Sequence, residues 1–285
     1  MQDKNTPQTS GALRFLYGTV LGRALLKLLT KPAVSVLVGK FLDTGLSRVL
    51  IPSFIRANRI ELSDFIAEDY RSFNEFFVRR IRPELRPVDR APFSLVSPCD
   101  GKLSTYCIEG NSAFTIKGTP YTVEELLQND ALAAQFQGGL CLIFRLSPED
   151  YHRYIYFDDG EKGENHFIPG VLHTVNPVVY DHQPVYKTNS REYSLLRTRH
   201  FGEAVQMEVG ALMVGRIVNL HQSHSFFRGE EKGRFEFGGS TIVLLLEKNA
   251  AVLDPAFAGE QETSVRCGQR IGYAVSREPK VCSEK

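Results

Sequence analysis

The sequence predicts an α+β protein: a mainly antiparallel β core, closed as a barrel or packed as a sandwich, preceded by N-terminal amphipathic helices. Two observations support this fold class. Residues 12–30 and 33–50 space their apolar side chains as helices do, whereas the chain after residue 92 forms short apolar runs separated by Gly, Asn and Pro turns. A length of 285 residues and a hydrophobic fraction of 42% supply one large core or a core with an appended module.

The N-terminal helices carry an excess of positive charge. Residues 1–60 hold nine Lys or Arg against two Asp, a net charge of +7, so the remaining 225 residues sum to −6 within a total of +1. The first helix spaces basic residues four apart, at Arg23, Lys27 and Lys31, and Pro32 separates it from the second. The second helix places apolar residues on one face: Val34, Leu37, Val38, Phe41, Leu42 and Val49.

Such helices suit either of two roles. A basic amphipathic helix lies flat on anionic lipid, where each cation near the surface contributes roughly 1 kcal/mol. The same periodicity is equally typical of helices that cover a core. We therefore expect a membrane-associating helical region that also contacts the β core.

A short helix and then a boundary follow this region. Ser72 and Glu75, ahead of Phe76 and Phe77, form a capping-box pattern that predicts a helix start. The Arg- and Pro-rich stretch 79–92 then ends it. We expect a helical region over residues 1–90 and a β-rich core over residues 91–285.

Within the core, one helix and several strands are expected. The helix covers residues 122–136, with Thr122 and Glu125 as its capping box. The strand candidates are residues 94–96, 102–108, 140–146, 177–180, 193–198, 204–209, 213–218 and 242–246.

Composition excludes several classes of protein. Five cysteines without a Cys-x-x-Cys pair argue against a disulfide framework or a thiolate zinc site, so reduced thiols are expected. The polar start, residues 1–10, predicts no secretory signal, and no apolar run reaches about 18 residues. Five histidines lack metal-ligand spacing and are expected to be structural: His173, His182, His200, His221 and His224. We expect no metal and no nucleic-acid partner.

The most distinctive pattern is Gly238-Gly239-Ser240-Thr241, between a charged aromatic run and the apolar run 242–246. Two glycines leave the backbone free enough for the serine oxygen to reach its own preceding carbonyl. Such a serine could cut its own chain and leave a pyruvoyl group at position 240. The plain alternative is a turn before a strand.

Other motifs, in a fixed order, favour the first interpretation. They are Ser97-Pro98-Cys99-Asp100-Gly101-Lys102, Asp150-Tyr151-His152-Arg153, Thr174-Val175-Asn176-Pro177, Val209-Gly210-Ala211-Leu212-Met213-Val214-Gly215-Arg216 and Lys232-Gly233-Arg234-Phe235. Arg14-Phe15-Leu16-Tyr17-Gly18 and Ser72-Phe73-Asn74-Glu75-Phe76-Phe77 agree with them. Together they resemble the phosphatidylserine decarboxylases of the Gly-Gly-Ser-Thr branch, over about residues 12–250.

The resemblance implies a self-cleaving, pyruvoyl-dependent lyase. Ser240 would be the nucleophile, His152 the base and Asp100 its orienting partner. Cleavage between Gly239 and Ser240 would yield a β chain, residues 1–239, and an α chain, residues 240–285. The pyruvoyl group from Ser240 would form a Schiff base with the amine of phosphatidylserine, and CO₂ and phosphatidylethanolamine would leave.

The family motifs also suggest residues for substrate contacts and for proton donation. The lipid phosphate and the serine carboxylate need cations, and Arg191, Arg216 and Lys102 lie inside motifs of the family. His152 is the expected proton donor. Many members carry His-Arg-x-His, but this chain has Ile155 at the second histidine.

Two other functions remain open from the sequence. A pyruvoyl enzyme could act on a free amino acid, or the chain could be a non-enzymatic lipid-surface module with an inert Gly-Gly-Ser-Thr turn. The expected partners are phosphatidylserine and an anionic membrane surface. We expect a homodimer of α/β heterodimers, peripheral on the cytoplasmic face of the cell membrane.

Overall fold

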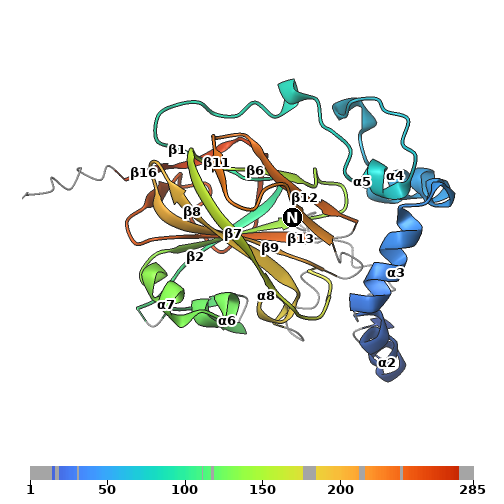
Figure 1. Ribbon diagram of the computed structural model, residues 1–285, viewed down its shortest axis with the longest axis horizontal. Helices are drawn as coiled ribbons and strands as arrows, with labels where there is room; N and C mark the ends of the chain where they lie inside the picture. Colours follow the sequence, from blue (N-terminus) through green and yellow to red (C-terminus); the bar gives the residue numbers. More distant parts are fainter. Residues whose placement is uncertain are drawn as a thin grey trace, which may run out of the picture.

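The computed structural model describes residues 15–16, 19–30, 32–110, 112–116, 119–175, 184–211, 216–237 and 240–275. These residues form antiparallel sheets with helices around them, which confirms the predicted α+β class (Figure 1). Some sequence predictions lie outside the described residues: the strand at 177–180, the start of the strand at 213–218, His182, and Gly238 with Gly239.

The largest sheet has eight antiparallel strands in the order β11-β7-β8-β9-β13-β5-β2-β15. Their bounds are β2 (Gly101–Cys107), β5 (Leu140–Leu146), β7 (Gly160–Ile168), β8 (Arg191–Thr198), β9 (Gly202–Val209), β11 (His224–Phe226), β13 (Ser240–Leu246) and β15 (Thr263–Val265). The central strand β13 pairs with β5 on one side and β9 on the other, and all of its residues are buried. A continuous apolar run such as 242–246 is typical of a strand covered on both faces.

Three small sheets complete the β structure. β10 (Arg216–Asn219), β12 (Glu231–Glu236) and β6 (Arg153–Ile155) form one, and β1 (Ser94–Val96), β16 (Arg270–Ala274) and β14 (Ala251–Leu253) form another. β3 (Ala113–Ile116) pairs only with β4 (Thr119–Thr122) among the described strands.

Hydrophobic clusters cover the two faces of the large sheet. Val243 and Leu245 of β13 pack on the face that carries the helices below the sheet in Figure 1. Ile242, Leu244 and Leu246 pack on the other face with Tyr154 and Phe235 of the small sheets. Because side chains alternate along a strand, Ser240 shares this second face.

The helix expected at residues 122–136 is interrupted. The Thr122–Glu125 capping box is confirmed, but α6 (Val123–Leu127) ends at Gln128, whose φ of 50° is left-handed. The chain then forms α7 (Asp130–Ala133) and a 3₁₀ turn, η4 (Ala134–Phe136). α8 (Val185–Thr188) packs beside α6.

The N-terminal helices form a column on one side of the core in Figure 1. They are α2 (Val20–Leu29), α3 (Pro32–Leu42), η1 (Gly45–Leu50), α4 (Ile51–Asn58), η2 (Leu62–Asp64) and α5 (Phe73–Phe77), and the segment that leads from them to β1 contains η3 (Pro83–Leu85). The helix expected over 33–50 therefore ends at Leu42. Ser72 does cap α5 by accepting a hydrogen bond from the Glu75 amide at 3.2 Å, but the Glu75 carboxylate accepts from Arg71.

Aromatic side chains attach this column to the β core. We call the buried set Leu42, Ile60, Phe65, Phe73, Phe76, Phe77 and Ile81 the cap cluster. Tyr151 and Phe237 of the core pack against it, and the rings of Phe73 and Phe237 meet edge to face at 4.9 Å. The predicted second role of the helices, contact with the core, is thus observed.

A fully buried ion pair joins two sheets. Lys232 Nζ on β12 lies 2.7 Å from Glu208 Oε1 on β9, and both side chains have no exposed surface. Asn219 Oδ1 accepts a second hydrogen bond from Lys232 at 2.8 Å, and Asn219 Nδ2 donates to Glu208 at 3.1 Å. Burial raises the pKa of Glu208 and lowers that of Lys232, while each charge opposes the shift of the other.

Replacing Lys232 with Met should lower the free energy of unfolding by about 3–5 kcal/mol, because it leaves the Glu208 carboxylate buried without its counter-charge. Urea unfolding followed by circular dichroism measures this loss. The matched control is Arg197→Ala, which breaks an exposed pair with Glu203 and should cost less than about 1 kcal/mol. Equal losses in the two variants would contradict the prediction.

Candidate active site

Ser240 is the first residue of β13 and is completely buried. Its neighbour across the ladder is Leu146, the last residue of β5. The Ser240 hydroxyl has no hydrogen-bond partner among the described residues. A buried hydroxyl without a partner is costly, so such a group points to chemistry or to a missing partner.

Asp100 lies on the opposite side of β5. It directly precedes β2, where Lys102 pairs with Arg145, so Gly101 lies beside Leu146. Gly101 has a φ of 144°, and a Cβ at this position would stand 2.6 Å from the Arg145 carbonyl oxygen. Ser240 and Gly101 therefore flank Leu146, and two inter-strand spacings put their backbones about 10 Å apart.

The Asp100 carboxylate is held by partners from outside its own strand. Arg86 binds it with two hydrogen bonds, Nε to Oδ1 at 2.7 Å and a terminal nitrogen to Oδ2 at 2.6 Å. The Cys267 amide donates to Oδ1 at 2.8 Å. This forked geometry is the strong form of an arginine–carboxylate pair.

His152 is fully buried one turn beyond β5. Its Nδ1 lies 2.8 Å from the Asp150 carbonyl oxygen, which can only accept, so Nδ1 carries the proton when the ring is neutral. Nε2 then offers a lone pair, and no described residue bonds to it. Burial, aided by the charge of Arg79, lowers the pKa of His152 to about 3.

Hydrogen bonds bring these segments together at one end of the large sheet. The Phe235 amide donates to the His152 carbonyl at 2.9 Å, five residues before Ser240, and the Ile155 amide donates to the Pro98 carbonyl at 2.9 Å. The described residues show no direct hydrogen bond between Asp100, His152 and Ser240. Backbone hydrogen bonds between their segments, rather than hydrogen bonds between their side chains, bring the three residues to this end of the sheet.

The cap cluster closes this end of the sheet. The Phe77 ring stands 4.1 Å from the His152 imidazole, centroid to centroid. Phe237, which precedes the two glycines, packs on Phe77 and Phe73 and has a φ of 24°, a left-handed backbone for a bulky residue. The cap thus contacts both the candidate base and the segment before Ser240.

Sequence reasoning missed two residues of this site. Asp150 is partly buried, and burial together with the nearby carboxylates Glu149 and Asp100 raises its pKa to about 7. Its position two residues before His152, within the same motif, was the available signal. No sequence pattern indicated a role for Arg86, because the Arg- and Pro-rich stretch that contains it, residues 79–92, predicts a boundary between the helical region and the core.

The predicted substrate residues occupy different places. Arg191 is buried and donates to four backbone carbonyls, those of Leu126, Lys187, Asn189 and Glu125, at 2.8 to 3.0 Å. Its donors are thus engaged within the fold. Lys102 pairs with Arg145, so alternation turns it to the face of the sheet opposite Ser240.

Arg216 lies at the junction of cap and core. It forms ion pairs with Asp43 at 3.5 Å and Glu236 at 3.0 Å. A cavity of about 360 Å³ beside it is lined by Asp43, Ser72, Asn74, Glu75, Val78, Arg153, Arg234 and Glu236. Two arginines, Arg153 and Arg234, therefore line this cavity, and Arg216 pairs with two of its carboxylates, those of Asp43 and Glu236.

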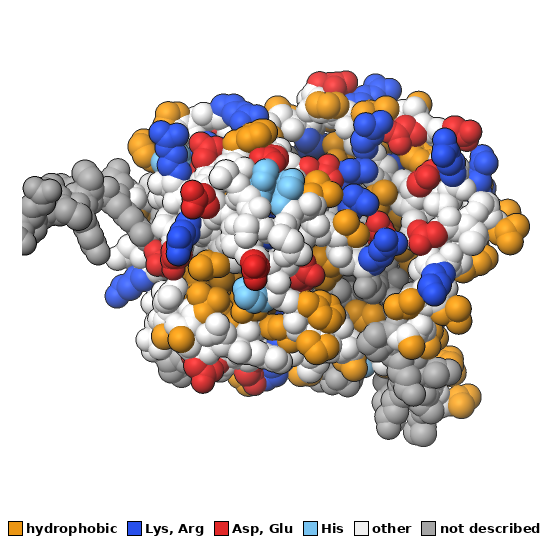
Figure 2. All heavy atoms as spheres, viewed as in Figure 1, with side chains coloured by type: hydrophobic (Ala, Val, Ile, Leu, Met, Phe, Trp, Pro, Cys, Tyr) orange, Lys and Arg blue, Asp and Glu red, His pale blue; other side chains and the backbone are white. Residues whose placement is uncertain are grey.

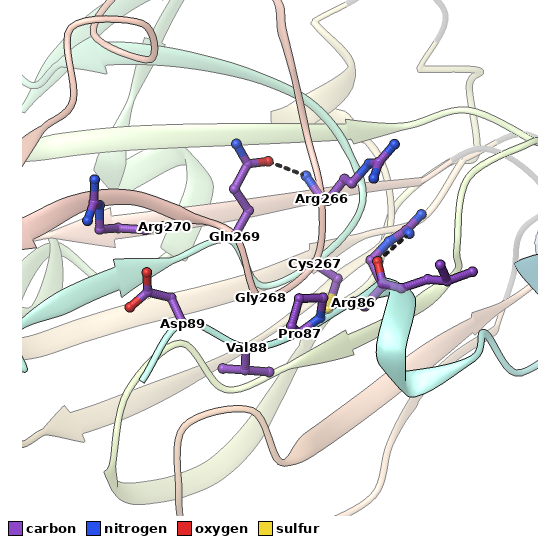
Figure 3. A pocket seen from close by; sticks show the side chains of 10 residues that line it. Arg86, Pro87, Val88, Asp89, Arg266, Cys267, Gly268, Gln269 and Arg270 are labelled. Atoms are coloured by element: carbon purple, nitrogen blue, oxygen red, sulfur yellow. Dashed lines mark hydrogen bonds between the residues drawn. The ribbon is translucent and has the colours of Figure 1, made fainter. Parts of the chain in front are cut away.

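A second cavity, of about 500 Å³, is shown with its lining side chains in Figure 3. Its walls are residues 85–89 and 266–270, which include Arg86 and Cys267, the two residues that hold Asp100. Burial raises the pKa of the Cys267 thiol, which keeps it protonated.

Comparisons with known proteins identify the family of the chain. A sequence profile described as phosphatidylserine decarboxylase matches residues 73–273. "Phosphatidylserine decarboxylase proenzyme 2" of Clostridium acetobutylicum is 41% identical, over 92% of this chain and 92% of its own. "Phosphatidylserine decarboxylase proenzyme" of Ruminiclostridium cellulolyticum is 39% identical over 94% and 93%, and that of Clostridium novyi is 36% identical over 91% and 92%.

The His152 ring should stay neutral from pH 8 down to about 4, because burial lowers its pKa to about 3. Histidine-selective ¹⁵N NMR measures this, and a His152→Gln variant identifies the signal. A folded pKa below the unfolded value of about 6.5 contributes stability above pH 6.5 that is lost as pH falls towards 3. A midpoint near 6.5 for this ring in the folded protein would contradict the burial argument.

Proposed function

The chain belongs to the phosphatidylserine decarboxylase family, and on this premise we propose that it is a proenzyme that cuts itself between Gly239 and Ser240 before it decarboxylates phosphatidylserine. The observation that carries the proposal is the pair of unsatisfied groups at one end of the sheet. Ser240 Oγ and His152 Nε2 are both buried without a hydrogen-bond partner among the described residues. One is a hydroxyl donor and the other a lone pair, so each could satisfy the other.

The cleavage chemistry needs only these groups and water. As His152 Nε2 takes the hydroxyl proton, Ser240 Oγ attacks the Gly239 carbonyl carbon; the C–O bond forms and the C–N bond breaks, leaving an ester and a free amine. Loss of the Ser240 α-proton then breaks the Cβ–Oγ bond and releases the Gly239 carboxylate, which leaves a dehydroalanine; this enamine takes up a proton at Cβ and becomes an imine. Water replaces the resulting imine nitrogen, ammonia leaves, and residue 240 becomes a pyruvoyl group.

The residues present fit such a group at position 240. The pyruvoyl carbonyl supplies a centre that forms a Schiff base with the substrate amine and draws in the electron pair released with CO₂. His152 would return a proton to the α-carbon. Asp150, with its pKa raised to about 7, could exchange that proton with solvent near neutral pH.

Asp100 keeps the orienting role in this proposal. Its charge already acts on the His152 turn, since it contributes to the raised pKa of Asp150. Its two oxygens are held by Arg86, so direct contact with the imidazole would require that pair to open.

We place the lipid headgroup at the junction of cap and core. A phosphodiester in the 360 Å³ cavity would compete with Glu236 for Arg216 and Arg234, and the Arg234 Nε is buried without a partner in the described structure. Arg153 on the same wall directly follows His152. The cavity therefore offers cations for the phosphate next to the candidate base.

The N-terminal helices supply a surface for the membrane. Exposed large apolar side chains are frequent there: Leu21, Leu25, Val36, Leu37, Phe41, Leu46, Val49 and Leu50. Figure 2 shows hydrophobic side chains along this edge of the molecule. Of the predicted apolar face, Leu37, Phe41 and Val49 are exposed, whereas Leu42 belongs to the cap cluster and Val38 packs against it.

The side chains of Arg23 and Lys27, and all of Lys31, lie outside the described structure. No helix in the described part of the chain is long and apolar enough to span a bilayer. We propose that the helical region, residues 1–90, rests on an anionic membrane and delivers the lipid to the core, residues 91–285.

Purified protein should separate under denaturing conditions into residues 1–239 and 240–285, the latter blocked to Edman degradation. Ser240→Ala should remain a single chain, and His152→Ala should cleave at least about a hundredfold more slowly, the size expected for loss of a general base. Intact-mass spectrometry measures both. Ser194→Ala removes another buried serine hydroxyl without a partner and should cleave normally. An uncleaved wild type would refute the mechanism.

Replacing Leu37, Phe41 and Val49 with Ser should weaken binding to phosphatidylserine vesicles, because these exposed side chains supply the buried apolar area. Cosedimentation measures binding, and self-cleavage should be unchanged. Phe167→Ser, an exposed residue on β7, is the control. Wild-type binding should also fall with salt, as the Debye length shrinks to about 3 Å at 1 M. Unaltered binding of the triple variant would assign the membrane contact to another surface.

A further inference from the structure

A cluster of two histidines and a glutamate lies where one sheet passes to another. His221 is in the loop between β10, a strand of a small sheet, and β11, an edge strand of the large sheet. His224 opens β11, and Glu230 directly precedes β12. All three are partly exposed, and histidine side chains gather at the surface on the side of the molecule seen in Figure 2.

The donor atoms of the cluster already lie close together. One ligand atom from each of the three side chains lies within 4.8 Å of the other two. His224 Nε2 and Glu230 Oε1 are 2.7 Å apart, and the two imidazoles stack with centroids 3.8 Å apart. The sequence spacing predicts structural roles for His221 and His224 only when the histidines are compared with one another and with the cysteines. Glu230 is the third member that such a comparison leaves out.

The backbone around the cluster is fixed by hydrogen bonds from β7. Asn165 Nδ2 donates to the His221 carbonyl at 3.0 Å, and Lys162 Nζ donates to the Gln222 carbonyl at 2.6 Å. The Phe227 amide donates to Glu230 Oε2 at 3.2 Å and so orients the carboxylate, whose Oε1 faces His224 Nε2. Fixed backbones lower the ordering cost of binding, as in other preorganised sites.

One atom of the cluster is unsatisfied. His221 Nδ1 is buried and has no hydrogen-bond partner in the described part of the chain.

We propose that His221, His224 and Glu230 bind one Zn²⁺-like divalent transition-metal ion, with water as the fourth ligand. Two nitrogens and one carboxylate oxygen form a ligand set that zinc accepts at about 2.0–2.2 Å, which puts ligand atoms about 3.4 Å apart. The His224–Glu230 contact must therefore open slightly, and one imidazole must turn out of the stack so that both lone pairs converge. Mg²⁺ and Ca²⁺ prefer all-oxygen sets.

The bound ion would join the small sheet to the edge of the large one. Its ligands come from both sides of the β11 strand, which pairs only with β7 in the described structure. It is independent of the decarboxylation chemistry proposed above, since no residue of that site belongs to the cluster. Its role is to hold the edge strand in place.

Isothermal titration of the EDTA-treated full-length protein with ZnCl₂ tests the proposal. The wild type should bind one Zn²⁺ per chain, and MgCl₂ should give no signal. His221→Ala with His224→Ala should weaken the Kd by at least about a hundredfold, since even residues that only orient a ligand contribute 10- to 100-fold. His166→Ala, which removes an exposed histidine outside the cluster, should bind Zn²⁺ as the wild type does.

A second measurement covers the case in which the double variant folds poorly. Glu230→Gln keeps the shape of the side chain but removes its charge, and should also weaken the Kd. Zn²⁺ should raise the thermal midpoint of the wild type and of His166→Ala, and raise it less in Glu230→Gln. No bound Zn²⁺ in the wild type, or equal affinity in wild type and double variant, would overturn the proposal.

Discussion

The spacing across β5 is the constraint on which the candidate site depends. Asp100 ends the turn before β2, Ser240 begins β13, and Leu146 stands between their strands. Two ladder spacings of about 4.8 Å are too far for a direct hydrogen bond between their side chains, so a third residue must mediate. The turn after Leu146 returns the chain and places His152 at this end of the sheet. The register of three strands therefore determines which residues can react together.

The residues that carry charge at this site are bound by arginines from elements distant in the chain. Arg86 reaches Asp100 from the segment that runs from the helical column to β1, and Arg79 donates to the Asp150 carbonyl at 3.5 Å. Arg79 also stacks on Phe65 of the cap cluster at 4.3 Å. The segment thus connects the helical column to the ionisable groups of the site, so its geometry and the protonation of these groups are linked.

The sequence predicted an element most accurately where a single physical rule, such as burial on both faces, determined its bounds. The run 140–146, apolar except for Arg145, is a strand with those bounds, because burial on both faces needs no alternation. β7 was missed because GEKGENHFI has no apolar period; its neighbours β8 and β11 hold it in the sheet. The helix at 122–136 broke at Gln128, whose left-handed backbone no pattern signalled. The two preceding glycines single out Ser240 in the sequence as a candidate, but tertiary partners such as Arg86, which binds Asp100, depend on contacts that local patterns do not encode.

The position of β13 has a consequence for how the molecule is made. A cut before Ser240 would free the chain end of a strand that is bonded along seven positions to β5 and six to β9. The shorter piece would then carry the middle of the sheet and little else of it, so it could not fold by itself. Assembly must precede scission, and the two pieces would stay together as one body without a covalent link. The hydrogen bonds of β13 with β5 and β9 would hold the two pieces together.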